Sequence, residues 1–185
     1  MNKKIIALLL GAVITCSMVA CGSQAEQTPN DTETEAAASQ SAPDFESTEA
    51  LINSIYEIKP MELDMVFIPV DLAAEFALKA YLGLTPEDAD KFVEATASEA
   101  MMGQACSIAV ADVADTADVA EIAQKMANGI DQNKWVCVEA DKLRVVTCDK
   151  YILLTMIDSR LDSVDDIVDA FTEVCGYTDG EYYKQ

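Results

Sequence analysis

Histidine is missing from all 185 residues of this sequence. It is the usual general base at neutral pH and the commonest protein ligand for metals. Its absence excludes Ser-His-Asp and Cys-His catalysis within this chain, together with zinc sites built on histidine. The sequence also lacks glycine-rich phosphate loops and a Gly-x-Ser-x-Gly nucleophile motif. We therefore predict no catalytic residues and no cofactor.

Basic residues are scarce in this chain. Only 12 Lys and Arg accompany 33 Asp and Glu, which gives a formal net charge of −21. An acidic surface repels the phosphates of nucleic acids, so no nucleic-acid partner is expected. The charge favours cations or basic peptides as partners, or serves solubility alone.

Two of the basic residues, Lys3 and Lys4, precede a long apolar run that begins at Ile5. The run leads to Met18-Val19-Ala20-Cys21. A positive head, an apolar stretch and a small residue before the cut are features of a secretory signal. The last four residues resemble the bacterial lipobox. We predict that residues 1–20 are a lipoprotein signal peptide and that Cys21 carries a diacylglycerol thioether.

This lipidation would anchor the chain to membrane lipid on the extracytoplasmic face of the cell membrane, because two acyl chains bind a bilayer stably. Two other interpretations stay open. The run could be an uncleaved membrane helix, although it is shorter than the about 20 residues that a span needs. It could also be an ordinary secretory signal that leaves Cys21 as a plain thiol.

Residues 22–43 contain no Val, Ile, Leu, Met or aromatic residue and are rich in Ser, Thr, Gln, Ala and Glu. Such a segment cannot bury enough apolar surface to offset the entropy of ordering. We predict that 21–43 forms a lipidated, disordered acidic tether. Residues 44–185 are long enough for one domain with its own core.

Four cysteines lie downstream of the tether, at Cys106, Cys137, Cys148 and Cys175. Outside the cytoplasm they are candidates for disulfides, and four cysteines allow three complete pairings, among which the sequence does not choose. No Cys-x-x-Cys spacing occurs, so neither a thioredoxin-like site nor a zinc ribbon is indicated. Four buried thiols that act as small hydrophobic groups are the alternative.

Hydrophobic periodicity predicts four helices and two strand pairs. The predicted helices cover 44–56, 71–82, 116–130 and 163–175, and the predicted strands cover 92–98, 106–113, 143–147 and 151–157. Residues 59–70 fit a short strand or an extended connector, and the tail 177–185 is predicted to be frayed. The expected helix caps are Asp44 or Ser47, Asp115 or Thr116, and Asp162 or Ser163.

These elements predict an α+β domain with an antiparallel sheet of about four strands, helices packed on one face, and further helices before it. The run Tyr151-Ile152-Leu153-Leu154 is apolar on both sides of a strand. It should therefore lie in the centre of the sheet.

Two aspartate clusters precede the last two helices. They comprise Asp112, Asp115 and Asp118, and then Asp158, Asp162, Asp165 and Asp166. Either cluster could bind Ca²⁺ through oxygen ligands, but neither has the EF-hand spacing. Carboxylates at helix N-termini also cap the helix and complement its dipole, so no metal site is assigned. Four aromatic residues are candidates for a ligand groove, namely Trp135, Tyr151, Tyr182 and Tyr183. The alternative is that the first two belong to the core and the last two to the tail.

The order of these features resembles a family of small Firmicute lipoproteins that share a C-terminal domain of unknown function. The resemblance covers roughly residues 50–175 and includes Tyr81-Leu82-Gly83-Leu84-Thr85-Pro86-Glu87-Asp88 and Tyr151-Ile152-Leu153-Leu154. It implies anchoring and a fold, and it transfers no site and no activity.

We expect a membrane-anchored binding or interaction domain that is not an enzyme, with a cell-envelope protein or a small ligand as its partner. Two alternatives remain. One is an extracytoplasmic enzyme that uses carboxylates or a free thiol, with Cys148 at a hairpin tip as the most exposed candidate. The other is an acidic module that responds to Ca²⁺.

Overall fold

The computed structural model describes residues 41–185. The predicted signal peptide, the lipidation of Cys21 and nearly all of the predicted tether lie outside the described residues. The described residues form the domain that follows them.

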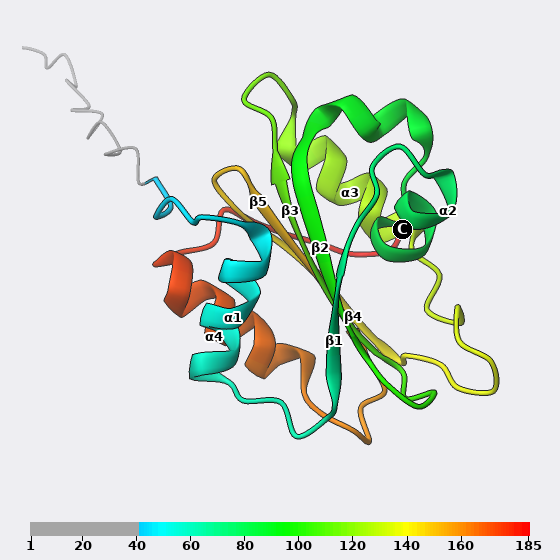
Figure 1. Ribbon diagram of the computed structural model, residues 1–185. Coiled ribbons are helices and arrows are strands. Elements are labelled where there is room, and N and C mark those ends of the chain that lie inside the picture. The colour runs from blue at the N-terminus through cyan, green and yellow to red at the C-terminus, as the bar shows by residue number, and fades with distance from the viewer. Residues whose placement is uncertain (1–40) are drawn as a thin grey trace, which may run out of the picture. The chain divides into compact units, whose positions relative to one another are not determined.

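A six-stranded antiparallel sheet forms the centre of this domain, in the order β1-β2-β3-β5-β4-β6 (Figure 1). Its strands are β1 (Met65–Pro69), β2 (Phe92–Ala100), β3 (Cys106–Val113), β4 (Lys142–Cys148), β5 (Tyr151–Ile157) and β6 (Gly180–Tyr182). The four predicted strands are present, and the segment 59–70 contains a strand. The predicted number of strands was too low.

The prediction of a frayed tail was also wrong, because β6 adds to the outer edge of the sheet. Its three residues are too few for an alternating pattern to be visible in the sequence. They are held by pairing with β4, where Tyr182 lies opposite Val145. The Asp179 N–H also donates to the Thr147 carbonyl at 2.8 Å.

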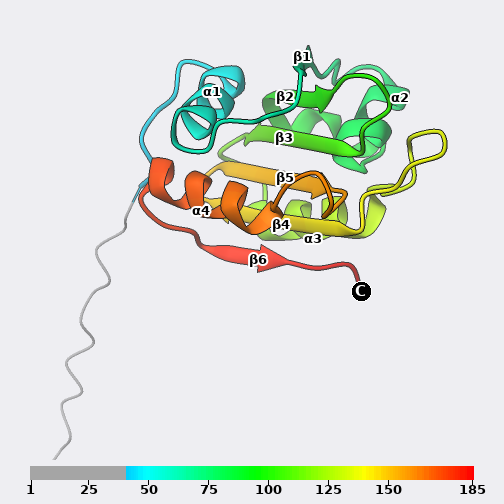
Figure 2. The same cartoon turned by 90° about the horizontal axis from the view of Figure 1, so that it is seen from below.

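Helices cover both faces of the sheet (Figure 2). On one face lie α1 (Thr48–Ile58) and α4 (Val164–Cys175). On the other lie α3 (Val119–Gly129), the single turn α2 (Glu75–Ala77) and the π-helical turn η1 (Leu78–Leu82). A 3₁₀ turn, η2 (Pro86–Lys91), leads into β2.

The prediction that helices pack on one face was therefore wrong, and the central strands give the reason. In β3, Val110 packs toward α1 and α4, whereas Ala109 packs toward α3. In β5, Leu153 and Leu154 divide between the two faces in the same way. Apolar residues on both sides of a strand require cover on both sides. The same residues confirm that 151–154 lies in a central strand.

Side-chain caps begin the three longest helices. The Ser47 hydroxyl accepts from the Ala50 N–H at 3.0 Å, and the Ser163 hydroxyl accepts from the Asp166 N–H at 3.3 Å. Both serines were among the predicted caps. For α3 the prediction was wrong, because Asp118 is the cap and accepts from the Glu121 N–H at 3.0 Å. The helix begins at Val119, one turn later than predicted.

The strand register gives the sheet two distinct ends. Ile157 pairs with Cys106 and Lys142 at one end, and Tyr151 pairs with Cys148 at the other. We call the first the loop end; it comprises residues 58–66, 99–106, 131–142 and 157–162. The second is the N-terminal end, because the described chain begins there. The Phe45 N–H donates to the Tyr151 hydroxyl at 3.3 Å.

Candidate binding surface at the loop end

A long loop, residues 131–141, joins α3 to β4 and projects from the loop end (Figure 1). Its base is closed because the Gln132 side chain donates to the Ala140 carbonyl at 2.6 Å, and the Ala140 N–H donates to the Gln132 carbonyl at 3.0 Å. The Asp131 carboxylate accepts from the Asn133 N–H at 2.9 Å. Compact loops whose ends meet in this way are frequently functional.

Lys134 holds this loop against the sheet. Its ammonium donates to the Ala80 carbonyl at 2.9 Å and to the Ser107 hydroxyl at 3.3 Å, and it forms an ion pair with Glu99. The Tyr81 ring lies 4.9 Å from the ammonium and the Trp135 ring 5.0 Å from it. Burial lowers the pKa of Lys134, and the Glu99 carboxylate opposes this shift.

The tip of the loop is hydrophobic and points outward. Val136 is 87% exposed, and the neighbouring Cys137 is also exposed. Cys137 has a φ of 71°, a left-handed conformation that is uncommon for a residue with a side chain. Because Trp135 is fixed over Lys134, the loop presents Val136 and Cys137 from a firm base.

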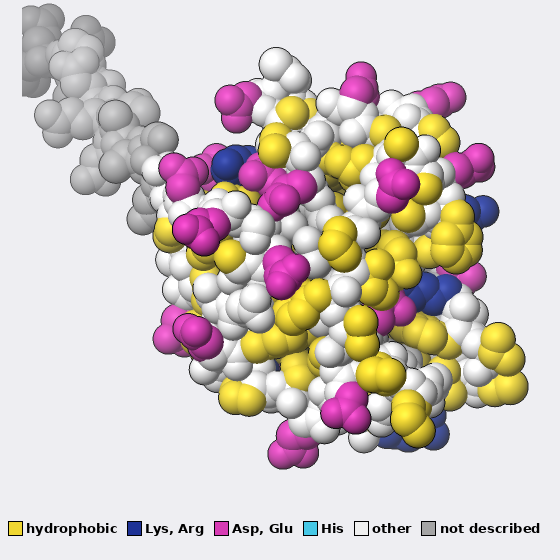
Figure 3. All heavy atoms as spheres, in the orientation of Figure 1, with side chains coloured by type: hydrophobic (Ala, Val, Ile, Leu, Met, Phe, Trp, Pro, Cys, Tyr) yellow, Lys and Arg dark blue, Asp and Glu magenta, His cyan; other side chains and the backbone are white. Residues whose placement is uncertain are grey.

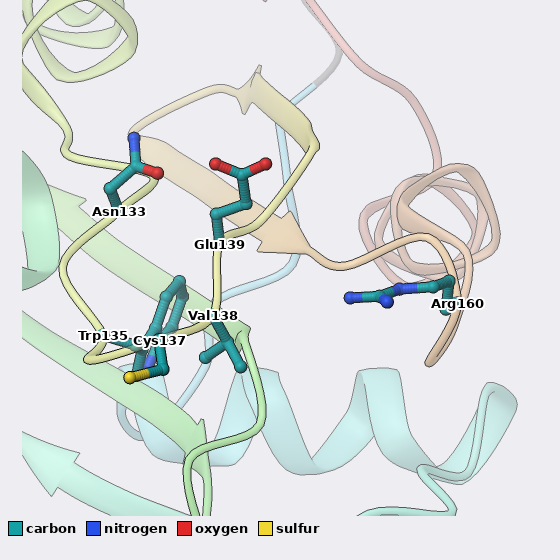
Figure 4. A pocket seen from close by; sticks show the side chains of 6 residues that line it. All are labelled: Asn133, Trp135, Cys137, Val138, Glu139 and Arg160. Carbon is teal, nitrogen blue, oxygen red and sulfur yellow. The ribbon is translucent and has the colours of Figure 1, made fainter.

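Beside this tip is an open cavity of about 370 Å³ (Figure 4). It is lined by Asn133, Trp135, Cys137, Val138, Glu139 and Arg160. Arg160 comes from the turn after β5, and Figure 4 shows its side chain reaching toward the loop. A single guanidinium, a single carboxylate and an indole give the cavity a mixed character that suits binding better than acid–base chemistry.

Two carboxylates fix the turn that carries Arg160. The Arg160 side chain donates to both Asp158 oxygens, and hydrogen bonds from Arg160 lower the pKa of Asp158 to about 2. The Ser159 N–H and hydroxyl donate to Asp141 at 2.6 and 2.7 Å, which lowers the pKa of Asp141. Asp158 and Asp141 are therefore anions that position the turn.

Five of the seven aspartates in the two predicted clusters are engaged in helix capping or ion pairs. Asp118 caps α3, Asp162 lies 2.9 Å from the Lys59 ammonium, and Asp165 lies 3.1 Å from Arg144. Asp112 lies 3.3 Å from the Lys150 ammonium. Among residues 41–185, no group of three or more Cys, Asp or Glu side chains is arranged to hold a metal ion.

The expectation that Cys148 is the most exposed thiol was wrong. Cys148 is 0% exposed, because the last side chain of β4 points into the core beneath α4. Cys106 and Cys175 are buried in the same core, so Cys137 is the exposed thiol of the described domain. Spacing alone does not distinguish an exposed thiol from a buried one here, because burial at a strand end depends on which face the last residue occupies.

The four candidate aromatic residues do not line a common groove. Tyr151 is buried at the N-terminal end, whereas Trp135 belongs to the loop end. Tyr182 is half-buried in β6, and the exposed Tyr183 lies beneath the Arg144 guanidinium at 5.5 Å. Only Trp135 contributes to a cavity beside an exposed hydrophobic tip.

Exposed hydrophobic side chains concentrate at the loop end. Eight large hydrophobic residues of the described domain are exposed, and five of them belong to this end: Ile58, Val66, Met101, Met102 and Val136. Met102 is 90% exposed at the β2–β3 turn. Figure 3 shows hydrophobic side chains running down this face of the molecule toward the loop end. Clusters of this kind mark interaction sites on soluble domains.

Family models, curated proteins and solved structures were all compared with this chain, and none matches. The resemblance to small Firmicute lipoproteins stays a prediction. Within residues 41–185, the longest helices are too short or too polar to cross a bilayer.

Proposed function

We propose that this chain is a lipid-anchored, extracytoplasmic binding domain that contacts a cell-envelope protein through its loop end. The anchoring half of this proposal rests on the sequence before Cys21. The binding half rests on one observation: exposed hydrophobic side chains gather at the loop end. This end lies opposite the N-terminal end, where the described chain begins.

The position of the two ends supports an outward-facing surface. The predicted tether leads into Asp44 and Phe45, and Phe45 bonds to Tyr151 at the N-terminal end. Met102 and Val136 lie at the other end of the sheet. A domain attached in this way presents Met102 and Val136 on the side away from its attachment. An envelope protein can reach both side chains there.

Charge indicates the chemistry of the partner. Glu62, Asp64 and Glu139 are exposed at the loop end, where exposed acids outnumber the exposed cations Lys142 and Arg160, and the whole chain is strongly acidic. A partner with an apolar patch and a basic rim would match both features, and its association would be faster at low salt. A second copy of this chain would bring like charges together, which opposes self-association.

A photo-crosslinking amino acid at Val136 tests this surface in intact cells. The matched control is Val93, which is also an exposed valine but lies at the start of β2, toward the N-terminal end. We expect one defined protein adduct from position 136 and not from position 93. The yield should fall as salt is raised, and it should be lost when Met102→Asp is added.

Four outcomes would overturn the binding half of the proposal. The first is the same adducts from both positions, and the second is an adduct with the mass of a dimer of this chain. The third is an adduct at position 136 that neither salt nor Met102→Asp changes. Absence of any adduct from position 136 in cells that contain the anchored protein would count equally against it.

A further inference from the structure

Two of the four downstream cysteines meet in the core beneath α4. Cys148 is the last residue of β4, and Cys175 is the last residue of α4. Both are buried in the cluster between the sheet and α1 and α4. The two thiols are near enough that each shifts the pKa of the other, and Tyr177 also acts on the pKa of Cys148.

The other two cysteines lie far from this pair. Cys106 is on the same face of the sheet, but it pairs with Ile157, whereas Cys148 pairs with Tyr151. The length of β5 between Tyr151 and Ile157 corresponds to about 20 Å at the rise of an extended strand. A disulfide requires Cα atoms within about 7 Å of each other. Cys137 lies on the exposed loop, also at the loop end.

We propose that Cys148 and Cys175 form a disulfide in the mature protein, and this rests on the extracytoplasmic location proposed above. The oxidant is a disulfide of a thiol–disulfide donor. One cysteine thiolate attacks the donor disulfide and forms a mixed disulfide; the second thiolate then displaces the donor sulfur. The Cys148–Cys175 bond forms, the S–S bond of the donor breaks, and the donor leaves as a dithiol that carries the two electrons and the two protons of the cysteine thiols.

Burial determines when this oxidation takes place. It raises the pKa of both thiols, so little thiolate is present once the domain has folded. Exchange requires a thiolate with access to the donor disulfide. The disulfide therefore forms readily in the unfolded or opening chain, and only slowly in folded, reduced protein.

The bond would join α4 to the sheet at the N-terminal end. It closes the segment 149–174 into a loop, which contains β5 and nearly all of α4. A closed loop lowers the entropy of the unfolded chain and so raises the melting temperature. For a domain of this size we expect reduction to lower the melting temperature by roughly 10 °C.

The test uses the full chain, extracted from membranes in detergent, reduced, unfolded, and refolded with glutathione and glutathione disulfide. We expect a product lighter by two hydrogen atoms, with a crosslinked peptide pair that contains Cys148 and Cys175. Dithiothreitol should restore the mass and lower the melting temperature of the wild-type chain. Cys148→Ala and Cys175→Ala should abolish both effects, and Cys106→Ala should leave both intact.

Full labelling of Cys148 and Cys175 by a thiol reagent after this refolding would overturn the proposal. A crosslink to Cys106 or Cys137 instead would do the same, as would a melting temperature that dithiothreitol leaves unchanged. Because the test is done in detergent with glutathione, it is independent of the crosslinking test at Val136. Failure of one leaves the result of the other standing.

Discussion

Lys134 is a cation that holds several segments of the structure together, and it lies beneath the candidate binding surface. It brings together a loop, the turn before Gly83 and two strands, through the partners Ala80, Glu99 and Ser107. Replacing one member of a largely buried ion pair leaves the other carboxylate uncompensated, which costs several kcal/mol. This one side chain therefore controls whether Trp135 and Val136 are held in place.

Lys134→Met should lower the free energy of unfolding by about 3 kcal/mol, measured by denaturant titration. It should also increase amide hydrogen exchange in residues 133–139. The matched control is Lys142→Met, because Lys142 is half exposed and lies 3.7 Å from Asp141. That change should cost less than about 0.5 kcal/mol. Equal effects of the two substitutions would contradict the role assigned to Lys134.

Arg160 sets the charge state of the turn beside the cavity. Arg160→Gln should raise the pKa of Asp158 from about 2 toward the ordinary 3.8, as measured by carboxyl NMR titration. Asp141 is the internal control, since Ser159 rather than Arg160 lowers its pKa. The folded pKa of Asp158 is depressed, so its contribution to stability is complete above the unfolded pKa and is lost as the pH falls through about 2. An unchanged pKa of Asp158 in the variant would contradict this.

At the scale of elements, α3 and η1 meet through two glycines. A Cβ atom at Gly129 would lie 1.9 Å from the Gly83 carbonyl oxygen. Gly83 itself has a φ of 69°, which ends η1 at the predicted residue. This close approach holds the end of α3, and with it the start of the loop that carries Val136.

Gly129→Ala should therefore lower the free energy of unfolding by at least about 2 kcal/mol, which corresponds to a fall of roughly 6 °C in melting temperature. Gly103→Ala provides the comparison, because no atom lies within 4 Å of its added methyl group. Only its positive φ of 70° is unfavourable there, so we expect a loss of about 1 kcal/mol. A Gly129→Ala protein as stable as the Gly103→Ala protein would show that the backbone contact is not rigid.

Elements with strong local signals could be predicted from the sequence. The caps Ser47 and Ser163 and the stop at Gly83 depend on neighbours in the chain, and all three were identified. The faces of the sheet, strand β6 and the partners of Lys134 depend on contacts between distant residues. Nothing in the spacing of residues marks Lys134, except that it is one of few basic residues and precedes the only tryptophan.

The candidate site was even less accessible to sequence analysis. Its cavity combines residues 133–139 with Arg160, and these segments approach each other only because β4 and β5 pair antiparallel. Trp135 was noted as a candidate, but Tyr151 was grouped with it although the two lie at opposite ends of the sheet. Aromatic residues in a sequence do not reveal which end of a strand they occupy.

At the scale of the whole molecule, several aspartates of the described domain serve in ion pairs and helix caps. Because Asp112, Asp118, Asp158 and Asp162 already have partners, millimolar Ca²⁺ should change the melting temperature by less than about 1 °C. Mg²⁺ at the same ionic strength is the control for general screening. A rise of several degrees that is specific to Ca²⁺ would support the Ca²⁺-responsive alternative.

The proposed location of the whole molecule depends on its attachment at Cys21. The most direct test is the intact mass of the protein extracted from membranes, with peptide mapping of its N-terminus. We predict a mature chain that begins at Cys21 and carries the mass of a diacylglycerol on that cysteine. A chain that begins at any other residue, or a Cys21 without acyl mass, would contradict the anchored location and with it the proposed outward-facing surface.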